Sequence, residues 1–274
     1  MILVDPLVVM PAALEKRLHC HFGSDLGWQV IAGEGTAHHI YRSTLGEQVW
    51  VARLEVQAPS TPGVDRQRES SILKTLAQHE WAPTLELEIP EQGFSLMPDY
   101  GEPINPNRLH ASQVDAIHQT INEMHGISEV PLLDYSGLFN AYRVSFTQRA
   151  PGLVQEVNLC EAALARLVDI GRCLVHHDLH GGNLLWNKRL TLIDWEYAGL
   201  GSPWFDYASL HRDLGFDLGQ LYQFDRLKHL DANTLTDSLS QALFVIEKLE
   251  MIWQAHRRLT DAGESNESNS RINK

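Results

Sequence analysis

Residues 174–210 read LVHHDLHGGNLLWNKRLTLIDWEYAGLGSPWFDYASL, and this stretch decides the fold. Two short apolar runs, 184–186 and 190–193, are joined by the polar turn Asn-Lys-Arg, which predicts a β-hairpin. We interpret the apolar residues before Asp178 as the end of a helix. The stretch therefore predicts a helix, a loop with two glycines and a hairpin in succession.

Polar side chains stand at the junctions of these elements. Asn183 comes just before the first hairpin strand, and Asp194 comes just after the second. Because the strands of a hairpin run in opposite directions, we expect both side chains at the same end. Amide and carboxylate oxygens suit Mg²⁺ with its retained waters and substrate phosphates. A separate carboxylate, Asp178, can orient and deprotonate a hydroxyl, so the set predicts phosphoryl transfer.

The same residues resemble a known family. The pattern H-x-D-x-x-x-x-N at His176, Asp178 and Asn183, followed by I-D-W-E, is similar to the catalytic and metal loops of the aminoglycoside phosphotransferase and choline kinase superfamily. These enzymes are small-molecule relatives of protein kinases. IDWEYAG and the Phe-Asp pair at 205–206 most resemble bacterial thiamine kinase and choline/ethanolamine kinase. The resemblance covers roughly residues 28 to 255.

The resemblance implies a role for each motif residue. Asp178 would be the catalytic base, and Asn183 and Asp194 would hold Mg²⁺. Supporting roles would fall to a structural histidine, a carboxylate that reaches a metal-bound water and an aspartate that buttresses the loop, namely His176, Glu196 and Asp206. His180 also matches a frequent family residue, but the sequence assigns it no role.

The chain is expected to fold as α+β, a bilobal protein-kinase-like fold with a small antiparallel β-sheet N-lobe and a larger helical C-lobe. Strands are predicted at 28–33, 39–44, 48–54, 84–89 and 94–97, with a single N-lobe helix at 65–79. C-lobe helices are predicted at 112–126, with Ser112 and Asp115 as a capping box, at 156–171, and along an apolar stripe at 239–253. The expected boundaries are 1–98 for the nucleotide-binding lobe, 99–262 for the catalytic and substrate lobe, and 263–274 for a disordered tail.

Six N-lobe and hinge residues are candidates for binding the nucleotide, which the resemblance implies to be ATP: Gly33, Gly35, Arg53, Glu69, Met97 and Asp99. The two glycines would let the backbone approach phosphate, although no third glycine completes the protein-kinase pattern. Arg53 stands in the place of the strand lysine and can hold phosphate, with Glu69 as its ion-pair partner. The segment 97–101 would be the hinge that receives adenine.

The phosphate acceptor is predicted to be a small-molecule alcohol. Thiamine is the leading substrate by resemblance, choline or ethanolamine come next, and an aminoglycoside or a sugar is an alternative. Five aromatic residues between 195 and 207 could surround a cation or pack the core, and Trp195 and Trp204 are the candidates for substrate contact. Two other classes stay open: a metal-dependent hydrolase, suggested by HHDLH, and a catalytically inactive kinase-like binding module.

The composition limits the partners. With 22 Lys and Arg against 35 Asp and Glu, the 274-residue chain has a formal charge of −13. This charge argues against nucleic acid or an anionic membrane as a partner and would attract a cationic substrate. The three cysteines show neither metal nor disulfide spacing, and no apolar run is long enough to span a membrane. We therefore expect a cytoplasmic monomer or weak dimer with reduced thiols.

Overall fold

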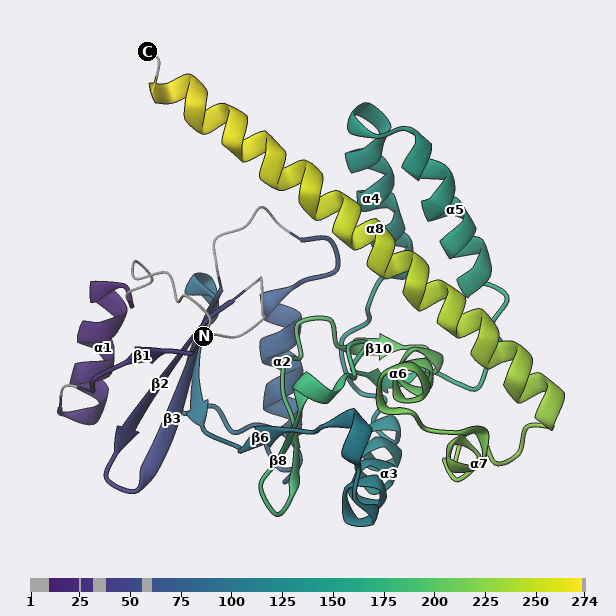
Figure 1. Cartoon of the computed structure of the whole chain (residues 1–274), viewed down its shortest axis with the longest axis horizontal. Helices are drawn as coiled ribbons and strands as arrows, with labels where there is room; N and C mark the ends of the chain where they lie inside the picture. The colour runs from purple at the N-terminus through teal and green to yellow at the C-terminus, as the bar shows by residue number, and fades with distance from the viewer. Residues whose placement is uncertain (1–9, 25, 32–37, 56–60, 273–274) are drawn as a thin grey trace.

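The computed structural model describes residues 10–24, 26–31, 38–55 and 61–272. Figure 1 shows a β-sheet part beside a larger helical part, with the long helix α8 (Ala232–Ile272) reaching from the second towards the first. The predicted α+β, bilobal fold class is therefore confirmed.

Five antiparallel strands form the sheet of the smaller lobe, in the order β1-β2-β3-β5-β4. They are β1 (Gln29–Val30), β2 (His38–Leu45), β3 (Gln48–Glu55), β4 (Leu87–Ile89) and β5 (Phe94–Pro98). A tight turn joins β2 to β3, and Gly46 in it has φ 62°, which glycine adopts at little steric cost. The central strand is β3, so it carries Arg53 in the middle of the sheet.

A second N-lobe helix, α1 (Ala12–Phe22), was not predicted from the sequence. Only Leu14 and Leu18 are buried in it, and they join a core cluster with Tyr41 and Phe94 of the sheet. Two residues one turn apart make too narrow an apolar stripe to stand out in an otherwise polar segment. The expectation of a single N-lobe helix was therefore wrong.

The predicted N-lobe helix is α2 (Arg66–Leu76). Its first turn is capped by the carboxylate of Asp65, which accepts two backbone N–H bonds of 2.9 and 3.0 Å. Ile72 and Leu76 are fully buried and anchor the helix in the core that continues into the helical lobe. This anchoring fixes the direction in which Glu69 points.

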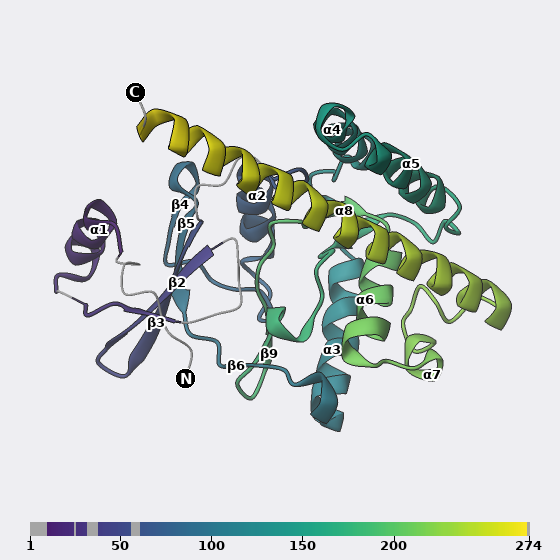
Figure 2. The same ribbon diagram turned by 45° about the horizontal axis from the view of Figure 1, so that its top comes forward.

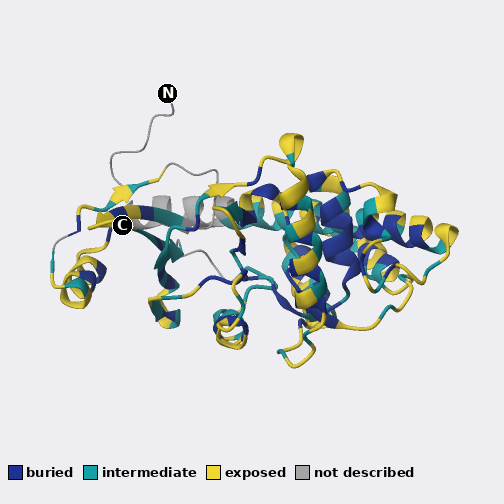
Figure 3. Cartoon of the chain, turned by 90° about the horizontal axis from the view of Figure 1, so that it is seen from below, coloured by how far each residue is buried: buried dark blue, intermediate teal, exposed yellow. Residues whose placement is uncertain are grey.

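The helical lobe is built from six α-helices in the described part of the chain: α3 (Ala111–His125), α4 (Tyr135–Arg149), α5 (Gly152–Leu164), α6 (Trp204–Leu214), α7 (Leu218–Leu221) and α8. Short 3-10 turns occur at Pro90–Gln92, Pro106–Arg108 and Gly181–Asn183. Most residues of α6 are buried, and Figure 3 shows the buried residues concentrated inside this lobe. In both Figure 1 and Figure 2, α4 and α5 lie against α8.

Two small sheets sit at the junction of the lobes. One pairs β6 (Glu102–Pro103), β8 (Leu184–Trp186) and β9 (Leu190–Leu192), and the other pairs β7 (Cys173–Val175) with β10 (Gly199–Gly201). The hairpin predicted within 184–193 is therefore present. The helix predicted before Asp178 is wrong, because the buried residues there form β7. A short apolar run has no period that separates a buried strand from a helix.

Three further boundaries differ from the predictions. The capping box of α3 is formed by His110 and Gln113 instead of Ser112 and Asp115. The helix expected at 156–171 is α5, which begins earlier and ends at Leu164. Helix α8 continues to Ile272, whereas composition predicted a disordered tail at 263–274. A helix that has already formed extends without a new nucleation cost. Among the described residues, none of the helices combines the length and apolarity that a bilayer crossing needs.

Candidate active site

The loop after β7 is held rigidly by a buried carboxylate. Asp206, at the start of α6, is fully buried and accepts the backbone N–H groups of His176 and His177 at 3.1 and 3.0 Å. Its Oδ2 also lies 3.0 Å from Nε2 of His125. Burial opposes ionisation, but the hydrogen bond from His125 and the neighbouring imidazoles keep the pKa of Asp206 below its ordinary value. An ionised Asp206 thus fixes the backbone that leads into Asp178.

His176 connects this loop to the hairpin. Its side chain is fully buried, and Nε2 donates to the carbonyl oxygen of Ile193 at 2.9 Å. Its ring lies against Trp195, with centroids 4.7 Å apart. The residue just before Asp194 is therefore tied to the loop that carries Asp178.

Asp178 and Asn183 are in direct contact. Nδ2 of Asn183 donates to the carbonyl oxygen of Asp178 at 3.0 Å and to its Oδ2 at 2.9 Å. Nε2 of His180 lies 3.6 Å from the same carboxylate oxygen. Burial raises the pKa of Asp178, but His180 and Asn183 outweigh it and hold the pKa below the ordinary range. Asp178 is thus an ionised, fixed carboxylate that can accept a proton.

Asp194 follows β9 in a left-handed conformation, with φ 67°. This unusual turn brings its carboxylate into the space between the lobes, where Oδ1 accepts a 2.7 Å bond from Arg53. Both Asp194 and Asn183 line the same cleft, as their places in the hairpin predicted. Because Nδ2 of Asn183 is committed to Asp178, its Oδ1 is the atom left for a cation. One amide oxygen and one carboxylate are donors that Mg²⁺ prefers.

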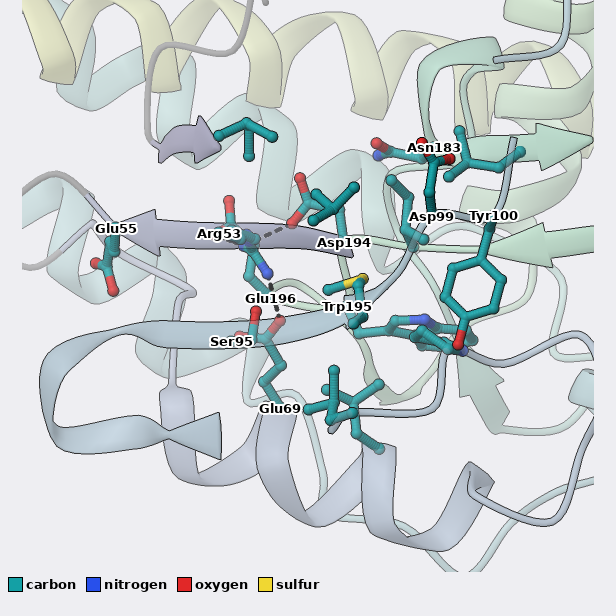
Figure 4. A pocket seen from close by; sticks show the side chains of 18 of the residues that line it. Arg53, Glu55, Glu69, Ser95, Asp99, Tyr100, Asn183, Asp194, Trp195 and Glu196 are labelled. Carbon is teal, nitrogen blue, oxygen red and sulfur yellow. Dashed lines mark hydrogen bonds and ion pairs between the residues drawn. The ribbon is translucent and has the colours of Figure 1, made fainter. Parts of the chain in front are cut away.

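Arg53 lies among three carboxylates. Its guanidinium donates to Glu69 at 2.8 Å, to Asp194 at 2.7 Å and to Glu196 at 3.0 Å (Figure 4). Burial lowers the pKa of Arg53, but the three carboxylates raise it above the ordinary value. Burial and the charge of Asp194 raise the pKa of Glu196 to about 8. Glu196 is therefore largely protonated near pH 7, and a cation bound beside Asp194 would favour its ionised form.

A cleft of about 870 Å³ separates the lobes. Of the residues given a role from the sequence, eight line it: Arg53, Glu69, Met97, Asp99, Asn183, Asp194, Trp195 and Glu196. Gly33 and Gly35 lie outside the described residues. In the segment that joins the lobes, Gly101 has φ 104°, and a Cβ there would lie 2.6 Å from the carbonyl oxygen of Trp186. The connection therefore passes close against β8 and needs glycine.

A second pocket of about 530 Å³ lies on the other side of the same carboxylates. Asp194, Glu196 and His180 line both cavities, and Asp178 lines the second. Its walls carry five aromatic rings, which are Tyr135, Tyr142, Tyr197, Phe205 and Trp253. Two further acidic side chains, Asp213 and Glu250, complete a wall that α6 and α8 provide.

Trp195 and Trp204 lie elsewhere than in this second pocket. Trp195 is 1% exposed, donates from Nε1 to Leu192 O and borders the interlobe cleft. Trp204 is fully buried and donates from Nε1 to Val168 O. The aromatic wall of the second pocket instead includes Tyr135 and Tyr142 of α4, a helix that was not predicted. A signal was present, since Phe139, Tyr142 and Phe146 recur at helical spacing.

The sequence of the chain matches the model of a known protein family. Residues 28–236 match the model of the phosphotransferase enzyme family, so the chain belongs to that family and is a phosphotransferase. This membership excludes the hydrolase interpretation. No curated protein sequence matches the chain.

Solved structures of kinases share the fold. The choline kinase of Streptococcus pneumoniae has 17% identity and a TM-score of 0.61, over 92% of this chain and 100% of that one. Spectinomycin phosphotransferase, solved with ADP and spectinomycin, has 16% identity and a TM-score of 0.63, over 97% of this chain and 93% of that one. The ethanolamine kinase of Plasmodium vivax has 15% identity and a TM-score of 0.62, over 89% of this chain and 79% of that one. Similarities at this identity show the fold and leave the substrate open.

Proposed function

We propose that this protein transfers the γ-phosphate of ATP to the hydroxyl of a small cationic metabolite, with Mg²⁺ as the cofactor. One observation carries the proposal. The interlobe cleft and the second pocket meet at Asp194 and Glu196, and the ionised Asp178 faces the second pocket at that junction. Nucleotide and alcohol would thus approach one another from opposite sides of the same carboxylates.

Asp178 is the proposed catalytic base. The hydrogen bond from Asn183 and the nearby His180 fix its orientation before a substrate arrives. A hydroxyl in the second pocket would donate to the carboxylate, which aligns the oxygen lone pair with the phosphate and takes the proton as the bond forms. His180, which the sequence left without a role, therefore helps to keep Asp178 ionised.

Asn183 and Asp194 are the proposed Mg²⁺ ligands. Bound there, the metal would neutralise charge on the phosphates of ATP. Arg53 would hold phosphate oxygens while Glu69 keeps its side chain extended into the cleft. We place adenine at the segment that contains Met97 and Asp99.

The acceptor site is proposed to be the second pocket. Besides three carboxylates at its inner end, Asp213 and Glu250 are part of its wall. Among the described residues that line it, Arg212 is the single lysine or arginine, and it is itself bonded to both of these carboxylates. The pocket thus has a negative balance beside aromatic ring faces, and both attract a cation.

The size of the pocket favours one acceptor over the others. A volume of about 530 Å³ falls in the range of small-ligand sites, and five rings line it. Thiamine, whose planar thiazolium ring is cationic and carries a hydroxyethyl group, matches these walls better than the smaller choline or ethanolamine. We therefore keep thiamine as the leading acceptor, and an aminoglycoside or a sugar as the alternative. A cytoplasmic location and a monomeric or weakly dimeric state stay predictions.

The decisive experiment is a coupled ADP-release screen with Mg²⁺ and ATP. Thiamine, choline, ethanolamine, amino sugars and aminoglycosides are each offered at equal concentration, and the phosphorylated product is verified by mass spectrometry. Release that depends on thiamine and is abolished by EDTA supports the proposal. A product from a neutral sugar alone would overturn the cationic acceptor. A mock purification from cells with the empty expression vector controls for a contaminating kinase.

A further inference from the structure

The residue before the proposed base has an unusual backbone. His177 has φ 68°, in the left-handed region that non-glycine residues rarely enter. This torsion lies between the buried His176 and Asp178, so it sets the direction in which the carboxylate of Asp178 leaves the loop. A left-handed residue other than glycine persists only where its surroundings hold it. The contacts of the His177 side chain therefore bear on catalysis.

Two hydrogen bonds define the state of the His177 ring. Nδ1 lies 3.2 Å from the carbonyl oxygen of Val175, and Nε2 lies 2.7 Å from the hydroxyl oxygen of Tyr135. Because a carbonyl oxygen only accepts, Nδ1 must carry the proton. Burial lowers the pKa of His177 to about 4, so the ring is neutral near pH 7. Its Nε2 is then unprotonated and accepts the O–H of Tyr135.

Tyr135 is itself fixed from three sides. It is the first residue of α4, and its hydroxyl oxygen accepts the backbone N–H of Ser202 at 3.0 Å. Its ring stacks on Phe205, with centroids 5.4 Å apart and an interplanar angle of 20°. The adjacent Gly201 leaves room for the pair, since a Cβ there would lie 2.9 Å from the imidazole of His177. The contact is thus built into the packing of β10, α4 and α6.

We propose that Tyr135 is a positioning residue for phosphoryl transfer, which acts through the His177 imidazole to hold the left-handed backbone that aims Asp178 at the acceptor. Asp206 fixes the backbone N–H of His177, and Tyr135 fixes its side chain. Two anchors on opposite ends of one residue leave its torsion little freedom. The inference rests on the proposed role of Asp178, but it concerns an interaction that exists without any substrate.

The kinetic test compares one substitution in two backgrounds. Tyr135→Phe removes the hydroxyl and keeps the ring, and we expect kcat to fall by about 10-fold or more with a much smaller change in the KM for the acceptor. The same substitution is then made in a His177→Gly background, where glycine adopts φ > 0 without support. There we expect Tyr135→Phe to change kcat by less than about twofold, because the group through which it acts is gone.

Two kinetic outcomes would overturn the inference. An equal loss of kcat in both backgrounds would mean that the Tyr135 hydroxyl acts through its hydrogen bond with Ser202 and not through His177. A rise in the acceptor KM with unchanged kcat would mean that Tyr135 contacts the acceptor directly.

A spectroscopic test needs no turnover. In ¹⁵N-labelled protein, the imidazole shifts of His177 should report the Nδ1–H tautomer in both proteins, because the Val175 carbonyl is unchanged. The shift of the unprotonated Nε2 should move downfield in Tyr135→Phe, because Nε2 loses the hydrogen bond from the hydroxyl. Tyr142→Phe is the matched control, since Tyr142 lines the same pocket and has its ring contacts with Phe146 and His256. It should leave the Nε2 shift of His177 unchanged. An Nε2–H tautomer in the wild type, or an unaltered Nε2 shift in Tyr135→Phe, would refute the positioning bond whatever the acceptor proves to be.

Discussion

The two cavities that meet at Asp194 differ in how the sequence encodes them. The interlobe cleft takes Asn183, Asp194 and Glu196 from one short segment, at spacings that can be read directly. The proposed acceptor pocket takes much of its aromatic and acidic wall from α4 and α8, which are far apart in the sequence and carry no motif. The comparison teaches that the phosphotransferase motif is encoded locally, whereas the pocket proposed for the acceptor is assembled by packing.

The largest effect is expected at the proposed catalytic base. Asp178→Ala should lower kcat by about 10³-fold, because the acceptor hydroxyl loses both its orientation and its proton acceptor. ATP affinity should stay within about threefold, since Asp178 lines the acceptor pocket and not the cleft. Steady-state kinetics and nucleotide titration by calorimetry measure the two quantities. Near-normal turnover would remove Asp178 from the mechanism.

The next effect should fall on the cleft side. Asp194→Ala should abolish Mg²⁺-dependent nucleotide binding and lower turnover by about 10²-fold or more, because one of two proposed metal ligands is lost. The substitution also leaves Arg53 with two of its three carboxylate partners. Nucleotide titrations with and without Mg²⁺ separate the loss of the metal ligand from the change at Arg53. Wild-type Mg²⁺ dependence in the variant would contradict the assignment of the metal site.

A smaller and more selective effect is expected in the acceptor pocket. Glu250→Gln should raise the KM for a cationic acceptor by about 5- to 10-fold, since the wall loses a charge, and should leave the KM for ATP unchanged. Glu247→Gln is the matched control, because Glu247 is exposed on the same helix and does not line the pocket. Equal changes in the two variants would mean that net charge, not the pocket, selects the acceptor.

The smallest expected effect concerns stability and pH. The pKa of Asp206 is lower in the folded protein than its ordinary value, so its ionised form stabilises the fold above the unfolded pKa of about 4. That stabilisation is lost as the pH falls through the lower, folded pKa. The difference in Tm between wild type and Asp206→Asn should therefore be largest near neutral pH and shrink below about pH 4. A difference that grows on acidification would refute the ionised state of Asp206.

The errors of the sequence-based predictions share a physical cause. The strand β7 was interpreted as a helix because its three buried residues are too few to show a period. Helix α1 was missed because only two of its residues, both apolar, are buried. Trp195 and Trp204 were chosen for the acceptor because aromatic residues are dense around them, yet both indoles are buried. Composition shows which residues could bind a cation, but burial decides which of them face a pocket.

The sequence by itself determined the fold class and the convergence of Asn183 and Asp194, because a hairpin with a short turn leaves its two ends no other arrangement. It also determined the family, through residues that lie close together along the chain. Tertiary structure alone decided that Tyr135 of α4 meets His177 and that Glu250 of α8 faces the acceptor pocket. Such contacts depend on how whole helices pack, and packing depends on the summed shape of many buried side chains that no local pattern records.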